Sequence, residues 1–375
     1  MSYNLSAKIF SLILLLIVCT FAGKLRVSKD KIINDKEETV VLQGVNMSGL
    51  EWHFKPWFGS VTINHVATQW KGNVIRFPLN AQWYINNENS QEKPYRTSVK
   101  EVVDFCARYG MWAILDLHWQ NETVQQKTID DAVAKNFWKL IATDFKDAEN
   151  VLYDLYNEPI NIDWNGWKAR AESYINVIKQ IDPSAIYIVG GTDWGYDLSQ
   201  AASNPISSSV STNVIYSSHH YPWKSTSFPA PVYSNLVNKV PLILGEFGWC
   251  VNNCKPCESN GGSSNFVTQL LAFVKAHPIN VSYAAWNFDQ SGCPLLLDTN
   301  RTPFTRNAFG NLVYSDLRSK NLIRFEKGNT IAKNRKVTMV PAGVYNFEKK
   351  RPVSVSIYQK VKVTGHLHYI QFPDV

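Results

Sequence analysis

The sequence has few charged residues and no long apolar stretch beyond its first 23 residues. Charged side chains make up 18% of the 375 residues and hydrophobic ones 45%, a balance too apolar for a disordered chain. No later run approaches the roughly 20 apolar residues of a membrane-spanning helix. Internal repeats and long low-complexity linkers are also missing. We therefore expect one large domain of roughly 250 to 300 residues with an appendage.

Two hydrolase signatures are absent as well. The chain has no Gly-x-Ser-x-Gly, which excludes the serine nucleophile elbow of esterases and lipases. No His-x-x-x-His follows on a helix, and His219 and His220 are neighbours in a predicted strand, so their side chains point to opposite faces. We expect neither a metal nor a cofactor.

The first 23 residues have the layout of a secretory signal peptide. Lys8 precedes an apolar run from Ile9 to Cys19, and the small residues Ala22 and Gly23 mark a cleavage site. The run is too short to span a membrane. We predict a secreted, soluble mature protein with no membrane association.

Cysteines and glycosylation sequons both bear on the compartment. Cys106 lies on the apolar face of a predicted helix, and we expect it to be a buried free thiol. Four other cysteines are Cys250, Cys254, Cys257 and Cys293. Their spacings would suit a zinc site in a cytosolic protein. In an exported protein we favour two disulfides, whose connectivity the sequence does not give. Sequons consistent with export begin at Asn121, Asn280 and Asn300, whereas the one at Asn46 lies in a predicted buried strand.

The net charge of +7 is concentrated in the tail. From Lys320 onward, eleven Lys and Arg stand against three Asp and Glu, so the rest of the chain is close to neutral. The charge of this main part gives no indication of a nucleic-acid partner. We also expect the protein to be a monomer. Residues 319–375 alternate as strands do, and they could form a small β-rich or irregular extension, a carbohydrate-binding accessory or a flexible tail. We favour a structural or undefined role.

Between residues 38 and 318, short β-branched runs alternate with helical patterns, which is typical of βα units. Eight runs are predicted strands: Val40 to Asn46, Asn73 to Leu79, Trp112 to His118, Val151 to Asn157, Ile186 to Gly190, Val214 to His219, Leu242 to Glu246 and Ser282 to Asn287. Helices are predicted from Ser98 to Tyr109, Ala132 to Phe145, Trp167 to Ile181, Asn265 to Ala276 and Thr305 to Leu317. Eight strands with helices between them favour a closed (β/α)8 TIM barrel over residues 24–318.

Polar residues close or directly follow these runs, at the end where the active site of such a barrel lies. They are Asn46, Arg76, His118, Asn157, Glu158, His219, Tyr221, Glu246 and Trp286. Surface loops would not place polar groups at the same end of so many strands. The two glutamates suit glycosidic bond cleavage, because that reaction needs one carboxylic acid to protonate the leaving oxygen and one carboxylate to attack carbon or activate water.

Two motifs carry a family resemblance. Glu158 lies in Asn157-Glu158-Pro159, and Glu246 lies in Leu-Gly-Glu-Phe-Gly at the end of the seventh strand. From about Val40 to Leu317 the chain resembles glycoside hydrolase family 5, the cellulase family of clan A. The resemblance implies a retaining mechanism with Glu158 as acid/base and Glu246 as nucleophile, about 5 to 5.5 Å apart.

The resemblance also implies the residues around the two glutamates. Arg76 would lie against the nucleophile and keep it ionised. Asn157 would bind the sugar 2-hydroxyl, and His118 would line the same subsite. His219 and Tyr221 match the His-x-Tyr pair, whose tyrosine hydroxyl reaches the nucleophile. The aromatic floor on which a sugar stacks would be Trp286.

The substrate follows less directly from the sequence. Thirteen tryptophans, many near predicted strand ends, favour a polysaccharide over a small glycoside. In this family β-1,4-glucan is the commonest expectation, so we predict an endo-β-1,4-glucanase. The alternatives are a β-mannanase or other β-glycanase, and a non-catalytic carbohydrate-binding barrel. The last would have lost a glutamate or Arg76, and the chain retains all three.

Overall fold

The structure is a computed structural model. It describes residues 24–51, 59–90, 93–121, 129–225, 230–251, 264–289, 293–298, 304–326, 358–363 and 366–371. The chain divides into two compact units, Met1–Asn329 and Thr330–Val375. The predicted signal peptide, residues 1–23, lies outside the described residues.

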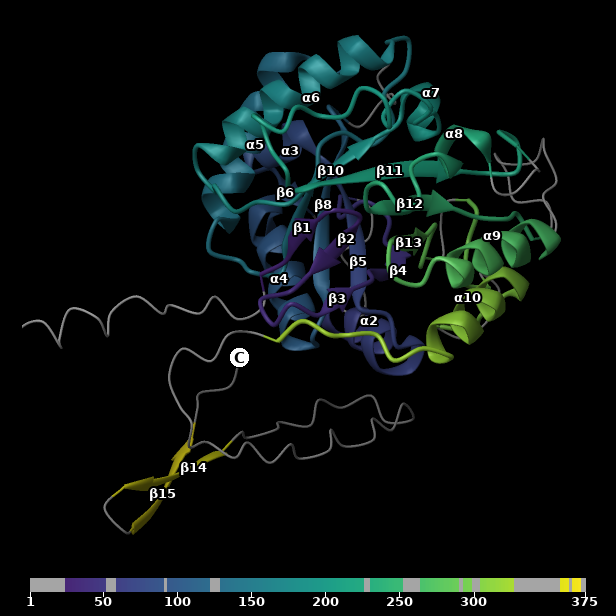
Figure 1. The fold of residues 1–375 in the computed structure, drawn as a ribbon. Coiled ribbons are helices and arrows are strands. Elements are labelled where there is room, and N and C mark those ends of the chain that lie inside the picture. Colours follow the sequence, from purple (N-terminus) through teal and green to yellow (C-terminus); the bar gives the residue numbers. More distant parts are fainter. Residues whose placement is uncertain are drawn as a thin grey trace, which may run out of the picture. The chain divides into compact units, whose positions relative to one another are not determined.

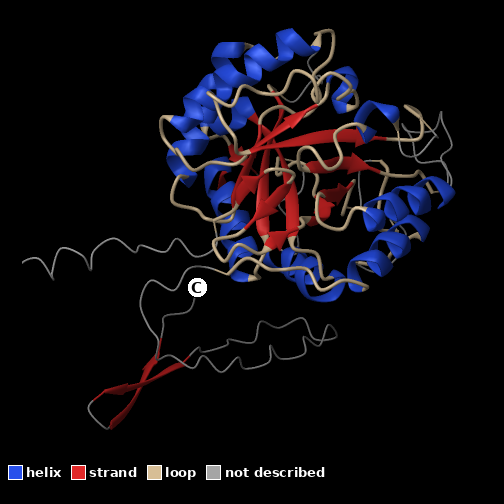
Figure 2. Ribbon diagram, viewed as in Figure 1, coloured by secondary structure: helices blue, strands red, loops and turns tan. Residues whose placement is uncertain are grey.

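Eight parallel strands close into a barrel in the order β10-β11-β12-β13-β4-β5-β8-β9 (Figure 1). The strands are β4 (Gln43–Asn46), β5 (Val74–Asn80), β8 (Trp112–Trp119), β9 (Val151–Asp154), β10 (Tyr187–Gly190), β11 (Val214–His220), β12 (Leu242–Phe247) and β13 (Val281–Ala285). Helices surround the strands, as Figure 2 shows. The predicted TIM barrel is confirmed, and each predicted strand contains or overlaps an observed one.

The five predicted helices are present with shifted ends. They are α4 (Tyr95–Arg108), α5 (Asp131–Phe145), α6 (Trp164–Lys179), α9 (Ser264–Ala276) and α10 (Ala308–Arg318). Capping residues account for three of the starts, because a side-chain oxygen satisfies a free backbone N–H in the first turn. Asp130 accepts from two such groups at α5, Asp163 accepts from Gly166 at α6, and Asn307 accepts from Gly310 at α10.

Several short elements were not predicted. A three-stranded antiparallel sheet precedes the barrel, formed by β1 (Arg26–Ser28), β2 (Lys31–Ile33) and β3 (Thr39–Val40). The predicted run from Val40 to Asn46 is therefore divided, because Val40 pairs with Ile32 of β2 and the barrel strand begins only at Gln43. The others are α2 (Ser60–His65), the π-helix η1 (Val66–Trp70), α3 (Ala81–Asn86), β6 (Asn89–Ser90), β7 (Lys93–Pro94), α7 (Thr192–Gly195) and α8 (Pro231–Ser234).

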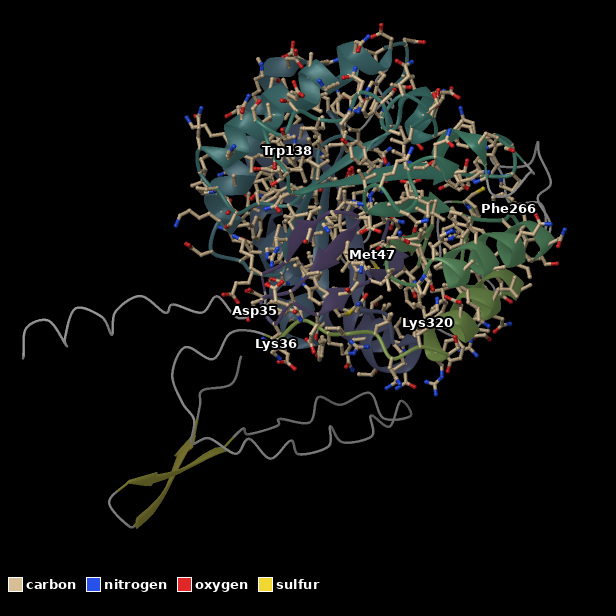
Figure 3. All side chains as sticks on the ribbon, viewed as in Figure 1. Asp35, Lys36, Met47, Trp138, Phe266 and Lys320 are labelled. Atoms are coloured by element: carbon tan, nitrogen blue, oxygen red, sulfur yellow. The ribbon has the colours of Figure 1, made fainter. Side chains whose placement is uncertain are left out.

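Two apolar cores hold the first unit together. The larger lies between strands and helices, and it includes Trp138 of α5 and Met47 just after β4 (Figure 3). The smaller combines inward-facing strand residues, such as Ile114 and Ile215, with Leu25 and Ile32 from the N-terminal segment. Burial of this apolar surface is the main favourable contribution to folding. The smaller core fills the barrel interior below the polar strand ends.

The first unit continues past residue 318, where we expected the barrel to end. Ile323 accepts a hydrogen bond from Asn73 at 2.8 Å, and Phe325 packs edge-on against Trp112 with ring centroids 6.1 Å apart. These contacts attach residues 319–326 to the barrel. In the second unit, β14 (Tyr358–Val363) and β15 (His366–Gln371) form an antiparallel hairpin, as the alternating pattern of the extension predicts.

The cysteine and sequon predictions have mixed outcomes. Cys106 is free and buried, as predicted, and Cys250 and Cys293 are disulfide-bonded. Asn46 is buried, as expected. Asn280 does not fit the expectation of an accessible glycosylation site, because its side chain is buried and its amide donates to Asn238 at 2.8 Å. Cys254, Cys257 and Asn300 lie outside the described residues.

Among the described residues, no helix combines the length and the apolar character needed to span a membrane.

Candidate active site

The alternation of strand residues explains why polar groups meet inside the barrel. Side chains two positions apart on a strand share a face. In β8 the inner face runs from Ile114, in the apolar interior core, to Asp116 and then His118. In β5 it runs from Val74 to Arg76. Each strand thus contributes apolar residues at its start and polar residues at its carboxyl end, which places the site above the interior core.

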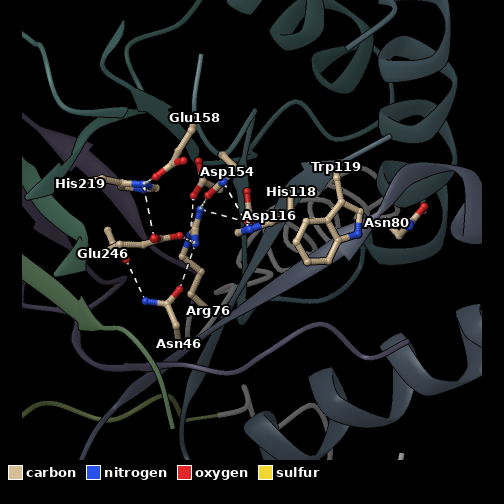
Figure 4. Close-up of polar contacts among 12 residues, drawn as sticks. Asn46, Arg76, Asn80, Asp116, His118, Trp119, Asp154, Glu158, His219 and Glu246 are labelled. Carbon is tan, nitrogen blue, oxygen red and sulfur yellow. Dashed lines mark hydrogen bonds and ion pairs between the residues drawn. The ribbon is translucent and has the colours of Figure 1, made fainter. Parts of the chain in front are cut away.

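Arg76 is the centre of this polar group (Figure 4). Its guanidinium is fully buried and meets three carboxylates. Nε donates to Asp154 Oδ2 at 2.8 Å, Nη1 donates to Glu246 Oε1 at 2.8 Å, and Nη2 lies 3.0 Å from Asp116 Oδ2. Two amide oxygens also accept from the guanidinium, those of Asn46 at 3.0 Å and Asn157 at 2.9 Å. Arginine suits this position because its planar head offers five N–H donors.

Glu246 is held through both carboxylate oxygens. Arg76 binds Oε1, and the Tyr221 hydroxyl donates to Oε2 at 2.8 Å. The side chain of Glu246 is 5% exposed. These two contacts fix the orientation of the Glu246 carboxylate, as a nucleophile requires.

A register shift brings His219 beside Glu246. Ser218 of β11 pairs with Leu244 of β12, but His219 pairs with Glu246, so Gly245 is skipped. A Cβ atom on Gly245 would come within 2.3 Å of the Ser217 hydroxyl and 3.1 Å of His219 Nε2. Glycine is required there because the imidazole and the serine occupy that space. The Leu-Gly-Glu sequence therefore has a packing role as well as a chemical one.

Glu158 follows β9 and faces Glu246 across His219. His219 Nδ1 lies 3.0 Å from Glu158 Oε1 and 3.7 Å from Glu246 Oε2. One oxygen of each glutamate and one nitrogen of His219 lie within 4.8 Å of one another. The side chain of Glu158 is 12% exposed, more than that of Glu246. The two glutamates, 88 positions apart in the sequence, therefore share one small volume.

His118, Asn157 and Trp286 form one side of the site. The Asn157 amide nitrogen lies 3.3 Å from His118 Nε2. The His118 ring stacks on Trp286, with centroids 5.6 Å apart and planes 16° from parallel. Trp286 keeps part of its surface accessible. All eight residues predicted for the site are thus joined by contacts to one another.

Burial determines the charge states around Arg76. One guanidinium can neutralise only one of its three carboxylates, and burial raises the pKa of Asp116 to about 7 and that of Asp154 to about 6, against the opposing effect of Arg76. Burial alone would lower the pKa of Arg76, but the carboxylates together raise it. The arginine therefore stays charged at any pH at which the protein is folded.

Both histidines of the site are neutral at moderate pH. Burial lowers the pKa of His118 and that of His219 to about 4, although Glu246 opposes the shift in each case. Burial and the neighbouring Glu246 carboxylate hold the pKa of Tyr221 well above its usual value. Near pH 5 to 7 these three side chains act as neutral hydrogen-bonding groups.

Within the part of the chain that the structure describes, Glu158, His219 and Glu246 have a spacing that would suit a metal ion. The Arg76 guanidinium lies 2.8 Å from Glu246, so a permanent positive charge already occupies one side of this group. A divalent cation would be repelled by it. The arrangement suits acid–base and nucleophilic chemistry by the two carboxylates better than metal binding.

Three acidic residues near the site were not predicted as part of it. Asp116 and Asp154 bind Arg76, and Glu51 accepts from the indole of Trp119 at 2.7 Å and the hydroxyl of Tyr95 at 2.9 Å. The strand period could have identified Asp116, because it lies two residues before His118 on the same face. Nothing in the sequence near Glu51 indicates its partners, which are 44 and 68 positions away.

Comparison with known proteins identifies the family. The family model described as cellulase (glycosyl hydrolase family 5) matches residues 33–292. The chain belongs to this family. Its similarity to Endoglucanase CelA of Streptomyces lividans is 26% identity over 284 residues, covering 72% of this chain and 57% of that protein. An endoglucanase of Clostridium saccharobutylicum is 29% identical over 272 residues, covering 71% and 57%. The chain spans about half the length of the curated relatives it matches.

Solved structures of similar fold support the same architecture. The β-glucanase SdGluc5_26A of Saccharophagus degradans superposes with a TM-score of 0.69 at 21% identity, covering 80% of this chain and 94% of that one. The catalytic domain of endoglucanase Cel5A (E5) of Thermobifida fusca, in complex with cellotetraose, gives 0.62 at 23% identity, covering 79% and 98%. At these identities the structures establish the shared barrel fold.

Proposed function

We propose that this protein is a secreted, retaining glycoside hydrolase that cleaves internal β-1,4 bonds of a glucan. The observation that carries the proposal is the spacing of the two glutamates, whose nearest oxygens lie within 4.8 Å. Retaining enzymes place their two carboxyl groups about 5 to 5.5 Å apart, whereas inverting enzymes separate them by about 6.5 to 9.5 Å to admit a water molecule. The spacing supports direct attack by a carboxylate.

The surroundings assign the two roles. Glu246 is oriented and charge-stabilised by Arg76 and Tyr221, so it is the group that attacks the anomeric carbon and forms the glycosyl-enzyme bond. Glu158 is the more exposed of the two, at 12% against 5%, and lies beside His219; in this assignment it gives its proton to the leaving oxygen. In the second step Glu158 takes a proton from water, and the water oxygen displaces Glu246 from the anomeric carbon.

The substrate class rests on the relatives. Proteins similar to this chain are named endoglucanases, and three of the similar structures contain cellotetraose. A β-1,4-glucan is therefore the substrate we propose, with internal cleavage. Secretion is supported by the leader sequence over residues 1–23 and by disulfide bonding of Cys250 and Cys293, since disulfides persist in oxidising compartments.

The test compares several glycans and follows the stereochemistry of cleavage. Purified mature protein and its Glu246→Gln variant are incubated with carboxymethyl cellulose, β-mannan and β-1,3-glucan, and reducing ends and viscosity are recorded. We expect the unaltered protein to release reducing ends from carboxymethyl cellulose and the Glu246→Gln variant to release none. The viscosity should fall early in the reaction, as internal cleavage requires. Proton NMR of the first product should show the β-anomer. Release from mannan alone would change the substrate, and an initial α-anomer would contradict the retaining mechanism.

A further inference from the structure

Asp116 lies between Arg76 and His118, and both bind the same oxygen. Oδ2 is 3.0 Å from Arg76 Nη2 and 2.6 Å from His118 Nδ1. Asp116 is fully buried, and its other oxygen has no hydrogen-bond partner among the described residues. A guanidinium nitrogen can only donate, and an ionised carboxylate can only accept. When Asp116 is ionised, Oδ2 therefore accepts from both neighbours, and His118 carries its hydrogen on Nδ1.

This hydrogen position determines what the other ring nitrogen can do. Because burial lowers the pKa of His118 to about 4, the ring has a single N–H at moderate pH, and Nε2 is an acceptor. The nitrogen facing Nε2 is the Asn157 amide, at 3.3 Å, which donates to it. The Asn157 oxygen accepts from Arg76 Nη2 at 2.9 Å. Both contacts favour the same orientation of the Asn157 amide.

We infer that Asp116 is a positioning residue that orients the Asn157 amide by fixing the hydrogen of His118 on Nδ1. An amide nitrogen carries two hydrogens, and the contact with His118 uses one. The second is left for a substrate hydroxyl at the reaction centre, which in the proposed function is the sugar 2-hydroxyl. The inference rests on that function for its effect on the reaction, whereas the position of the hydrogen does not depend on it.

The substitution Asp116→Leu tests this arrangement with little change in volume. Because Arg76 Nη2 and His118 Nδ1 bind the same oxygen, an asparagine could keep an acceptor in that place, whereas leucine removes it. The hydrogen on Nδ1 of His118 would then have no acceptor, so it would no longer be held on that nitrogen. A matched control is Asp154→Leu, which also removes a buried carboxylate from Arg76 but one that binds Nε, at 2.8 Å.

The first measurement reads the hydrogen directly. In protein labelled with 15N-histidine, two-bond 1H–15N spectra distinguish the protonated ring nitrogen from the bare one, and the His118 signals are assigned by their loss in His118→Gln. The spectra are recorded above pH 7, because burial raises the pKa of Asp116 to about 7 and the contact requires its ionised form. We expect the hydrogen on Nδ1 in the unaltered chain and in Asp154→Leu, and a substantial fraction of it on Nε2 in Asp116→Leu. A hydrogen on Nε2 in the unaltered chain would overturn the inference, even if the Asp116 variant does not fold.

The second measurement tests the connection to the substrate. kcat/KM is determined for an aryl β-cellobioside and for its analogue that lacks the 2-hydroxyl on the ring attached to the aryl group. We expect Asp116→Leu to lower kcat/KM about 10- to 100-fold on the first substrate, the range known for carboxylates that orient metal-binding histidines, and less than about 3-fold on the second. Asp154→Leu should lower both by the same factor. The double variant Asp116→Leu/Asn157→Ala should be no worse than Asn157→Ala.

The outcomes separate the inference from the proposed function. Equal losses on both substrates for Asp116→Leu, or additive losses in the double variant, would overturn the positioning role. If the unaltered chain cleaves neither the cellobioside nor any of the three glycans, the proposed function fails, and the histidine spectra still decide whether Asp116 fixes the hydrogen of His118.

Discussion

Arg76 Nη1 lies 2.8 Å from Glu246 Oε1, although the two residues are 170 positions apart in the chain. The contact joins β5 to β12 across the interior of the barrel and is fully enclosed by protein. A buried charge pair is stable only when further hydrogen bonds satisfy both partners, and here Asn46, Asn157 and Tyr221 supply them. The pair therefore serves both the stability of the barrel and the orientation of Glu246.

Substitution of Glu158 should remove proton donation to the leaving oxygen, and substitution of Glu246 should remove attack on the anomeric carbon. We expect Glu158→Gln to lower kcat on carboxymethyl cellulose by about 10²- to 10⁴-fold, the range for loss of a general acid, and Glu246→Gln by at least as much. Both should fold normally by circular dichroism. Aryl glycosides with acidic leaving groups need no protonation, so Glu158→Gln should retain much more activity on them than Glu246→Gln. Near-normal activity of either variant on cellulose would remove that residue from its role.

Loss of the Tyr221 hydroxyl should weaken the nucleophile without unfolding the barrel. A hydrogen bond to a charged group contributes about 1.5 to 3 kcal/mol, so Tyr221→Phe should lower kcat/KM by about 10- to 100-fold. The control is Tyr187→Phe on the neighbouring strand β10, because the buried Tyr187 hydroxyl has no hydrogen-bond partner among the described residues. Similar kinetics for the two variants would argue against a role of Tyr221 in the reaction.

Removal of the buried guanidinium should destabilise the fold. Arg76→Met leaves Asp116, Asp154 and Glu246 without their shared cation, and breaking a buried ion pair costs about 3 to 5 kcal/mol. The deficit should shrink as the pH falls from 7 towards 4, because protonation removes the unpaired charges. Urea unfolding of Arg76→Met at both pH values measures this. The control is Arg26→Met, which breaks the ion pair between Arg26 and Glu37, whose side chains are 47% and 69% exposed. This substitution should change the free energy of unfolding by no more than about 0.5 kcal/mol.

His220 should contribute to the acid sensitivity of the fold. Burial lowers its pKa to about 4 from an ordinary value of 6.5, and the ring bonds Tyr233 at 2.7 Å and the Ser225 carbonyl at 3.0 Å. Between pH 6.5 and 4 the unfolded chain takes up a proton that the folded chain does not, so stability is lost as the pH falls through that window. The free energy of unfolding should therefore depend less steeply on pH in His220→Gln. Parallel pH profiles for the two proteins would contradict this assignment.

The sequence by itself determined the barrel, because its evidence is local. Apolar runs of strand length, helical periodicity between them and capping residues such as Asp130 depend only on neighbours along the chain. The same is true of the polar residues at strand ends: once eight parallel strands are inferred, Glu158 and Glu246 must lie at one end of the barrel. The motifs around them added the family resemblance.

Only the tertiary structure decided which side chains share charge and protons. Three features depend on how the strands are aligned when the barrel closes: the contacts of Asp116 and Asp154 with Arg76, the approach of Glu51 to Trp119, and the register shift that brings His219 beside Glu246. Likewise, the burial of Asn280 and the attachment of Phe325 to Trp112 arise from segments far apart in the chain. Periodicity shows which face a residue occupies, but the partner across the barrel is set by strand alignment, which depends on the packing of the whole fold.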